Sequence, residues 1–271
     1  MTIRLLKATI LFYALVFITG CDKDDPPAGD PEIIIPNYLL RSIEWDNGLK
    51  AEFSYNDSLL TDINYQFQST TSATKFLWTG KKMNEMFSEE SLYKNTYTYD
   101  NNGKLTVITN SSKSGTLPTS YTLEFTYESN KLKTQEYFRI NEAGKQLQAT
   151  TSYQYDNSGD LYRAVTASGN SVITNTINNW SPVVSLNPLN YTTTSLDENY
   201  TIYNYAVISQ AKKLPAKITR TVKIGAGTEE TEKIEENTYT ISGFRIDKVI
   251  TAIKYPDMPG NNMTVESIYK Y

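Results

Sequence analysis

Carboxylates are the groups with which this chain could do chemistry, because it contains no histidine and one cysteine, Cys21. Without histidine, a Ser-His-Asp or Cys-His mechanism is impossible, and so is a zinc site with histidine ligands. Adjacent glutamates occur as three pairs: Glu89-Glu90, Glu229-Glu230 and Glu235-Glu236. Paired carboxylates hydrolyse glycosides when roughly 5–10 Å separates them, but neighbours on a strand point to opposite faces. We therefore interpret these acids as solvated charge and predict no enzymatic activity, with a carboxylate-based hydrolase as the least favoured alternative.

One short segment could bind a cation. Asp156-Asn157-Ser158-Gly159-Asp160 places oxygen donors at alternate positions, like the start of a calcium loop. It lacks the flanking helices and the later bidentate glutamate of such a loop. An acid followed by glycine also caps a tight hairpin turn, and the sequence therefore predicts a capped turn, no metal site and no cofactor.

Cys21 follows a segment with the charge and hydrophobicity of a secretory leader. Arg4 and Lys7 precede an apolar run over residues 8–18, which is shorter than the roughly 20 residues that a membrane-spanning helix needs. Ile18-Thr19-Gly20-Cys21 resembles the lipobox of bacterial lipoproteins. The resemblance implies a signal peptide over residues 1–20, cleavage before Cys21, and a lipid anchor with fatty acids such as palmitate on the mature chain.

The next residues resemble an export signal. Residues 21–36 are rich in charge, proline and glycine and predict a disordered tether behind the lipidated cysteine. Lys23-Asp24-Asp25 resembles the surface-export signal of Bacteroidota lipoproteins, which implies the outer membrane and the cell surface. The periplasmic face is the alternative, and Asp22 leaves retention on the inner membrane open.

The charge balance bears on the partners. The chain has 26 basic and 30 acidic residues, and removal of the leader with Arg4 and Lys7 leaves 24 basic residues and a net charge of −6. Nucleic-acid binding needs a basic footprint, so we predict no nucleic-acid partner.

From residue 37 to 271 the sequence predicts a single β-rich domain. It contains 21 tyrosines and many threonine, isoleucine and valine residues, which are favoured in strands. Polar and apolar residues alternate over residues 121–127, 217–224 and 264–269. This period of two indicates antiparallel strands with one packed and one solvated face.

The turns between these strands share one pattern: an aromatic residue, an acid or amide, a turn residue, and a hydrophobe that opens the next strand. The copies are Trp45-Asp46-Asn47-Gly48-Leu49, Tyr55-Asn56-Asp57-Ser58-Leu59, Trp78-Thr79-Gly80-Lys81-Lys82-Met83, Tyr99-Asp100-Asn101-Asn102-Gly103-Lys104-Leu105, Tyr127-Glu128-Ser129-Asn130-Lys131-Leu132 and Tyr155-Asp156-Asn157-Ser158-Gly159-Asp160-Leu161. Tyr99, Tyr127 and Tyr155 follow one another at steps of 28 residues, which indicates a repeat array.

The segments Tyr97–Leu105 and Tyr153–Leu161 resemble the tyrosine-aspartate repeat of RHS-type proteins. With the lipobox, the layout is similar to Bacteroidota lipoproteins that carry a domain of unknown function built from such repeats. The resemblance implies a long, twisted antiparallel meander of hairpin repeats, which we expect to curl into an open half-barrel. The chain is too short for the closed shell of full RHS proteins, and toxin encapsulation is therefore not expected.

Residues 177–215 interrupt the pattern. Ser195-Leu196-Asp197-Glu198 is a capping-box sequence, and the apolar spacing after it predicts one short amphipathic helix over residues 196–209. Three aromatic residues of this irregular stretch could stack on a ligand, because loops on rigid scaffolds often carry function. They are Trp180, Tyr191 and Tyr200.

The sequence thus favours a lipid-anchored, non-catalytic module of the cell envelope that binds or displays something at the outer membrane. Its partners would be the membrane, through the lipid, and a glycan, a lipid or another envelope protein. The alternative is a carrier or chaperone for lipid or an outer-membrane client, which would need an apolar concave face.

Overall fold

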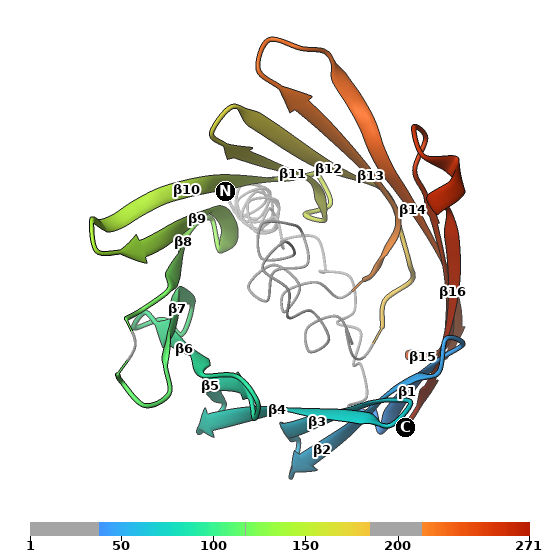
Figure 1. The fold of residues 1–271 in the computed structure, drawn as a ribbon. Coiled ribbons are helices and arrows are strands. Elements are labelled where there is room, and N and C mark those ends of the chain that lie inside the picture. The colour runs from blue at the N-terminus through green and yellow to red at the C-terminus, as the bar shows by residue number, and fades with distance from the viewer. Residues whose placement is uncertain (1–37, 117, 185–212) are drawn as a thin grey trace, which may run out of the picture. The chain divides into compact units, whose positions relative to one another are not determined.

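The computed structural model describes residues 38–116, 118–184 and 213–271, and these residues form a closed antiparallel β-barrel (Figure 1). Each strand pairs with the next along the chain, and β1 pairs with β16. In the described ranges, the strands are Ser42–Trp45 (β1), Leu49–Asn56 (β2), Leu59–Phe67 (β3), Thr70–Thr79 (β4), Lys82–Ser88 (β5), Tyr93–Tyr99 (β6), Leu105–Ser112 (β7), Tyr121–Glu128 (β8), Lys131–Asn141 (β9), Gly144–Tyr155 (β10), Leu161–Ser168 (β11), Ser171–Trp180 (β12), Pro215–Ile224 (β13), Glu229–Ser242 (β14), Arg245–Lys254 (β15) and Met263–Lys270 (β16). A short 3-10 helix, Pro259–Asn261 (η1), precedes β16.

The expected open half-barrel is wrong, because the first and last strands join. Ile43 lies opposite Tyr269, and Trp45 lies opposite Ser267. The side chains add to this seam: Lys270 donates to Glu44 Oε2 at 2.7 Å. The predicted all-β antiparallel meander is present, but its first and last strands, which are far apart in the sequence, pair with each other.

Regular β-bulges help to close the barrel. At the ends of six even-numbered strands the register shifts by one residue, at Ser54/Tyr55, Leu77/Trp78, Thr98/Tyr99, Thr126/Tyr127, Gln154/Tyr155 and Thr240/Ile241. Each shift puts an extra residue in the partner strand, and such bulges bend a strand and increase its twist. Their repetition at one end of the barrel adds curvature at every second hairpin, which explains why the sheet closes instead of staying open.

The helix predicted over residues 196–209 lies outside the described residues. Within the described ranges, no helix is long and apolar enough to cross a membrane.

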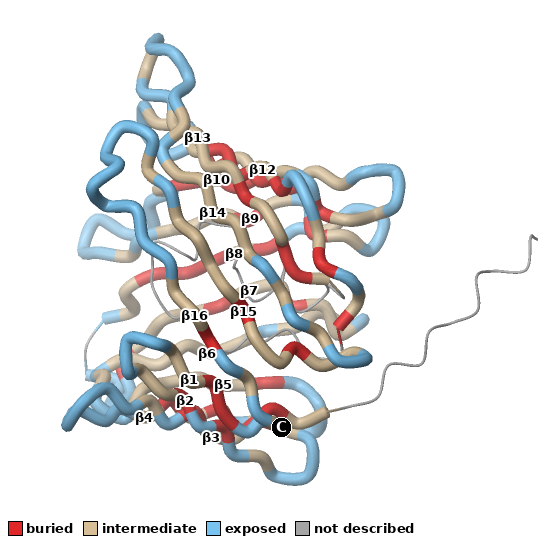
Figure 2. Tube along the Cα trace, turned by 90° about the vertical axis from the view of Figure 1, so that its right-hand side faces the viewer, coloured by how far each residue is buried: buried red, intermediate tan, exposed pale blue. Residues whose placement is uncertain are grey.

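The two faces of the sheet differ in character. In β8, Tyr121, Leu123 and Phe125 are buried, whereas Thr126 and Glu128 are exposed. The pairing continues this alternation around the barrel, because Leu123 lies opposite Ile108 of β7 and Tyr137 of β9. A buried face on a closed barrel is the concave one, and we call it the inner face. Figure 2 shows buried segments along the strands and exposed hairpin ends.

The predicted capped turns are confirmed. Asp100 Oδ1 accepts the N–H groups of Asn102 and Lys104 at 2.9 and 2.8 Å, and Asp156 Oδ1 accepts that of Asp160 at 2.9 Å. Gly103 has a φ of 80°, in the left-handed region that glycine adopts without strain. The turns that follow even-numbered strands lie at one end of the barrel, which we call the repeat rim. The Trp45 turn lies at the opposite rim, because it follows an odd-numbered strand.

The repeated tyrosines connect neighbouring hairpins along the repeat rim. Tyr127 donates to the carbonyl of Leu105 at 2.8 Å, and Tyr155 donates to the carbonyl of Leu132 at 2.9 Å. Lys131 Nζ lies 5.0 Å from the centre of the Tyr155 ring, within cation–π range. The lysine and leucine that open one repeat thus contact the tyrosine that ends the next strand. Because Leu105 and Leu132 contact Tyr127 and Tyr155 in the same way, the 28-residue spacing places each tyrosine against the preceding hairpin.

Several half-buried tyrosines predict a loss of stability in alkali. Burial raises the pKa of four of them to about 12 from the ordinary value of 10.0, namely Tyr65, Tyr127, Tyr155 and Tyr269. Between these pH values the unfolded chain loses phenol protons that the barrel keeps, so the free energy of unfolding falls as pH rises. We expect on the order of 1 kcal/mol per pH unit for Tyr65 and Tyr269, and less for Tyr127 and Tyr155, whose greater contact with water screens the effect.

Urea unfolding at several pH values between about 9 and 12, together with phenolate absorbance, measures this dependence. The Tyr127→Phe variant is the control. It removes one titrating phenol but keeps the aromatic ring and every lysine, and lysines titrate in the same pH range. Its slope should be shallower than that of the wild type, and identical slopes would contradict the assignment.

Candidate binding site at the rim of the barrel

The aromatic residues expected to bind ligand are only partly described. Trp180 ends β12, is half-buried and packs against the apolar cluster that contains Leu161 and Ile177. This packing is a structural role, and ligand binding by Trp180 stays a prediction. Tyr191 and Tyr200 lie outside the described residues, as do Cys21, Lys23, Asp24 and Asp25.

The two side chains of the pair Glu235-Glu236 in β14 point to opposite faces, as the sequence predicts. Glu236 lies on the outer face, where hydrogen bonds from Lys254 and Lys217 lower its pKa to about 2. Glu235 lies on the inner face, with its side chain 14% exposed and Lys233 Nζ 3.5 Å from its Oε2. The carboxylates of Glu235 and Glu236 therefore cannot act together on one substrate. Glu89 and Glu90 lie in the turn between β5 and β6 and are exposed.

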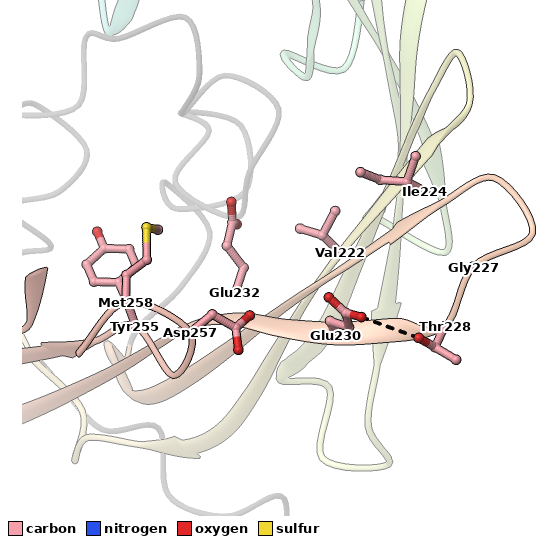
Figure 3. Close-up of a pocket in the computed structure, with 9 residues that line it drawn as sticks. All are labelled: Val222, Ile224, Gly227, Thr228, Glu230, Glu232, Tyr255, Asp257 and Met258. Atoms are coloured by element: carbon pink, nitrogen blue, oxygen red, sulfur yellow. Dashed lines mark hydrogen bonds between the residues drawn. The ribbon is translucent and has the colours of Figure 1, made fainter. Parts of the chain in front are cut away.

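A cavity of about 410 Å³ lies at the opposite rim, between the β13–β14 hairpin and the loop that leads to η1 (Figure 3). The hairpin supplies Val222 and Ile224 from β13 and Glu230 and Glu232 from β14. The loop supplies three residues from the other side: Tyr255, Asp257 and Met258. The lining therefore combines apolar side chains with three carboxylates.

The carboxylates of this cavity differ in their partners. Glu232 pairs with Arg220, whose Nε lies 2.7 Å from its Oε2. Glu230 accepts a long hydrogen bond of 3.5 Å from Thr228. Within the described ranges, Asp257 has no hydrogen bond or ion pair. All three residues are exposed, whereas a general acid must be kept protonated by burial or a like charge. The arrangement therefore suits binding of positive charge better than hydrolysis.

The backbone of β14 is free on one side beside this cavity. Its pairing with β15 begins at Ile234, which lies opposite Lys254. In the part of the chain that the structure describes, Glu229–Lys233 pair with β13 alone. Figure 1 shows the β13–β14 hairpin rising beyond the end of its neighbour. Because alternate residues of a strand direct N–H and C=O groups to each side, this segment offers unpaired backbone groups to solvent.

Sequence reasoning missed this site. It considered Glu229 and Glu230 only as an adjacent pair, and it did not join them to Asp257, which lies in a separate loop. One signal was available: Pro256 and Pro259 mark an irregular connection between two strands, and such loops often carry binding residues.

Comparison with known proteins bears on the fold. No family model matches the chain, and no curated protein sequence matches it. Among solved structures, a porin-like protein from Bacteroides uniformis ATCC 8492 aligns over 88% of this chain and 99% of its own, with a TM-score of 0.56 and 17% identity. The chain has the fold of this porin-like protein. A porin-like protein from Bacteroides vulgatus ATCC 8482 covers 86% of this chain and 98% of its own, with a TM-score of 0.45 and 10% identity.

Proposed function

We propose that this chain is a lipid-anchored, non-catalytic binding protein of the outer membrane, whose barrel stands in water beside the bilayer. The observation that carries the proposal is the distribution of charge over the two faces of the barrel. Barrels that cross a membrane present an apolar band about 25 Å tall to lipid and a polar interior. The present barrel has the reverse arrangement.

Its outer face carries ion pairs between lysines and glutamates, within one strand, between neighbouring strands and across one strand. They include Lys270–Glu44 at 2.7 Å, Lys50–Glu52 at 2.6 Å, Lys248–Glu266 at 2.6 Å, Lys217–Glu236 at 2.9 Å, Lys254–Glu236 at 2.8 Å and Lys145–Glu124. A lysine on the lipid face of a barrel costs roughly 2–4 kcal/mol at the bilayer midplane. These charges on the outer face thus favour its contact with water over contact with lipid.

The lipid anchor and the cellular location are inferred from the sequence. The lipobox-like segment that ends at Cys21 supports attachment through lipid, and Lys23-Asp24-Asp25 supports display at the cell surface, with the periplasmic face as the alternative. The fold shared with a porin-like Bacteroides protein fits a protein of the outer membrane. Suitable partners of such a module are a glycan, a lipid or another envelope protein.

A second function, a carrier for lipid or an outer-membrane client, is favoured by the inner face. Leu123, Phe125 and Tyr153 lie there, each at most 6% exposed, and the apolar clusters extend over most of the strands. The inner face thus has the apolar character that a carrier needs, and a cargo would have to enter between side chains that already pack against one another. Mass spectrometry of the purified protein for co-purified lipid would separate a carrier from a display module.

The placement of the barrel in water can be tested with residues 22–271, which lack the leader and the cysteine. We expect this protein to be monodisperse without detergent and to stay unbound in flotation with phospholipid vesicles, because its outer face is charged. The full-length protein should float with the vesicles through its lipid. Insertion of residues 22–271 into vesicles, with ion conduction, would overturn the proposal.

A further inference from the structure

We propose that the rim cavity binds a short, extended peptide that carries a lysine or arginine next to an apolar residue, with the peptide backbone along the free edge of β14. The inference deepens the proposed binding function by naming its ligand class. It rests on the placement of the barrel in water, because the rim must be reachable by a partner.

The first argument concerns the backbone. Glu229–Lys233 lack a partner strand on the β15 side within the described residues. An extended peptide can add to such an edge, because its backbone N–H and C=O groups match those of the strand. A closed barrel leaves free edges only where a hairpin protrudes beyond its neighbours, as here and in Gly144–Leu147 of β10. The edge of β14 differs in having the cavity beside it.

The second argument concerns the side chains beside the edge. Glu230 and Asp257 supply negative charge, and Val222, Ile224 and Met258 supply apolar surface. Ile224 is 68% exposed and Met258 is 53% exposed, so both have surface left to bury. Alternate side chains of a bound strand point to opposite sides, so the basic and apolar residues of the peptide can reach different parts of the cavity.

The third argument concerns selectivity. Three glutamates, Glu229, Glu230 and Glu232, lie within four positions of this edge. Because like charges repel, they discourage pairing of this edge with the same edge of a second copy of the chain. The same charges attract a basic strand. One residue of the group, Glu232, is already paired with Arg220, and this leaves Glu230 and Asp257 to receive a cation.

Calorimetric titration of the full-length protein in a neutral detergent tests the proposal, with the synthetic peptide Lys-Val-Lys-Val-Lys, blocked at both ends, as the probe. We expect saturable binding that weakens as salt is raised, and no binding of Glu-Val-Glu-Val-Glu. The double substitution Glu230→Gln and Asp257→Asn should weaken binding about tenfold. The matched control is Glu142→Gln, an exposed acid in another turn of the same rim, which should bind as the wild type does.

Pairing with the edge is tested by methylating the peptide backbone. A bound strand directs alternate N–H groups to the edge and to solvent. Two peptides are compared, one N-methylated at its second and fourth residues and the other at its first, third and fifth. One of them should bind about tenfold more weakly than the parent, and the other should bind like the parent. Equal binding of both to the wild type would overturn backbone pairing.

Two further results would also overturn the proposal. They are unchanged affinity in the double variant and equal affinity for the acidic peptide. The thermal melting curve of the double variant confirms that it is folded, since both residues are exposed. If the barrel is soluble without detergent but does not bind the basic peptide, only the ligand class is wrong. If residues 22–271 insert into vesicles, the proposed function itself is wrong.

Discussion

Cys21→Ser should abolish incorporation of fatty acid into the protein and leave the leader attached. Only a thiol can receive the diacylglycerol that the lipobox resemblance implies, and cleavage before residue 21 depends on that lipid. Each buried methylene contributes about 0.8 kcal/mol to membrane binding, so loss of the acyl chains removes the contribution of the lipid to that binding. Metabolic labelling with an alkyne fatty acid and the intact mass of the protein measure both effects.

Ala28→Ser is the matched control, because it introduces the same side chain into the predicted tether. It should be labelled and trimmed like the wild type. If Cys21→Ser is still labelled and is trimmed at the same bond, the lipid anchor has been wrongly assigned. Protease shaving of intact cells would then still decide between the cell surface and the periplasmic face.

Leu132→Ala should lower the free energy of unfolding by about 3 kcal/mol, because it leaves a cavity in a closely packed cluster. Leu132 is 0% exposed and opens β9 at the repeat rim. Its carbonyl accepts the hydroxyl hydrogen of Tyr155, and the cluster around it contains Leu105, Phe125 and Leu161. Urea unfolding monitored by circular dichroism measures the change.

Lys133→Ala tests the adjacent position. Lys133 is exposed and lies 3.2 Å from Glu128, and a surface ion pair of this kind contributes less than about 1 kcal/mol. The urea concentration at which the Lys133→Ala variant is half unfolded should therefore stay close to that of the wild type. Equal losses in the two variants would show that the repeat rim is held by something other than the inner-face cluster.

The local features of the barrel can be predicted from the sequence because they depend on neighbours along the chain. The alternation over residues 121–127 corresponds to β8, Tyr121–Glu128. The caps at Asp100 and Asp156 depend on hydrogen bonds that reach no more than four residues along the chain. Side-chain period and turn chemistry are enough to place such elements.

Closure of the sheet could not be predicted in this way. Ile43 pairs with Tyr269 at the other end of the chain, and no sequence pattern near either residue indicates this pairing. The bulges that curve the sheet depend on how neighbouring strands are aligned, which amino-acid composition does not reveal. The site was missed for the same reason, because Glu230 and Asp257 come from separate segments that only the pairing of β13 to β16 brings together. The lipid anchor at Cys21 and the export signal at residues 23–25 lie outside the described residues and stay predictions.

The seam between β1 and β16 also places the two ends of the described chain at one end of the barrel. Arg41 donates its N–H to the carbonyl of Lys270, so the chain enters the barrel and leaves it at the repeat rim. The cavity beside Asp257 lies at the opposite rim, so the two ends of the described chain and the cavity occupy opposite ends of the barrel. If the proposed lipid anchor is correct, the rim with the cavity is the end of the barrel that a partner in solution would meet without first passing the anchored end.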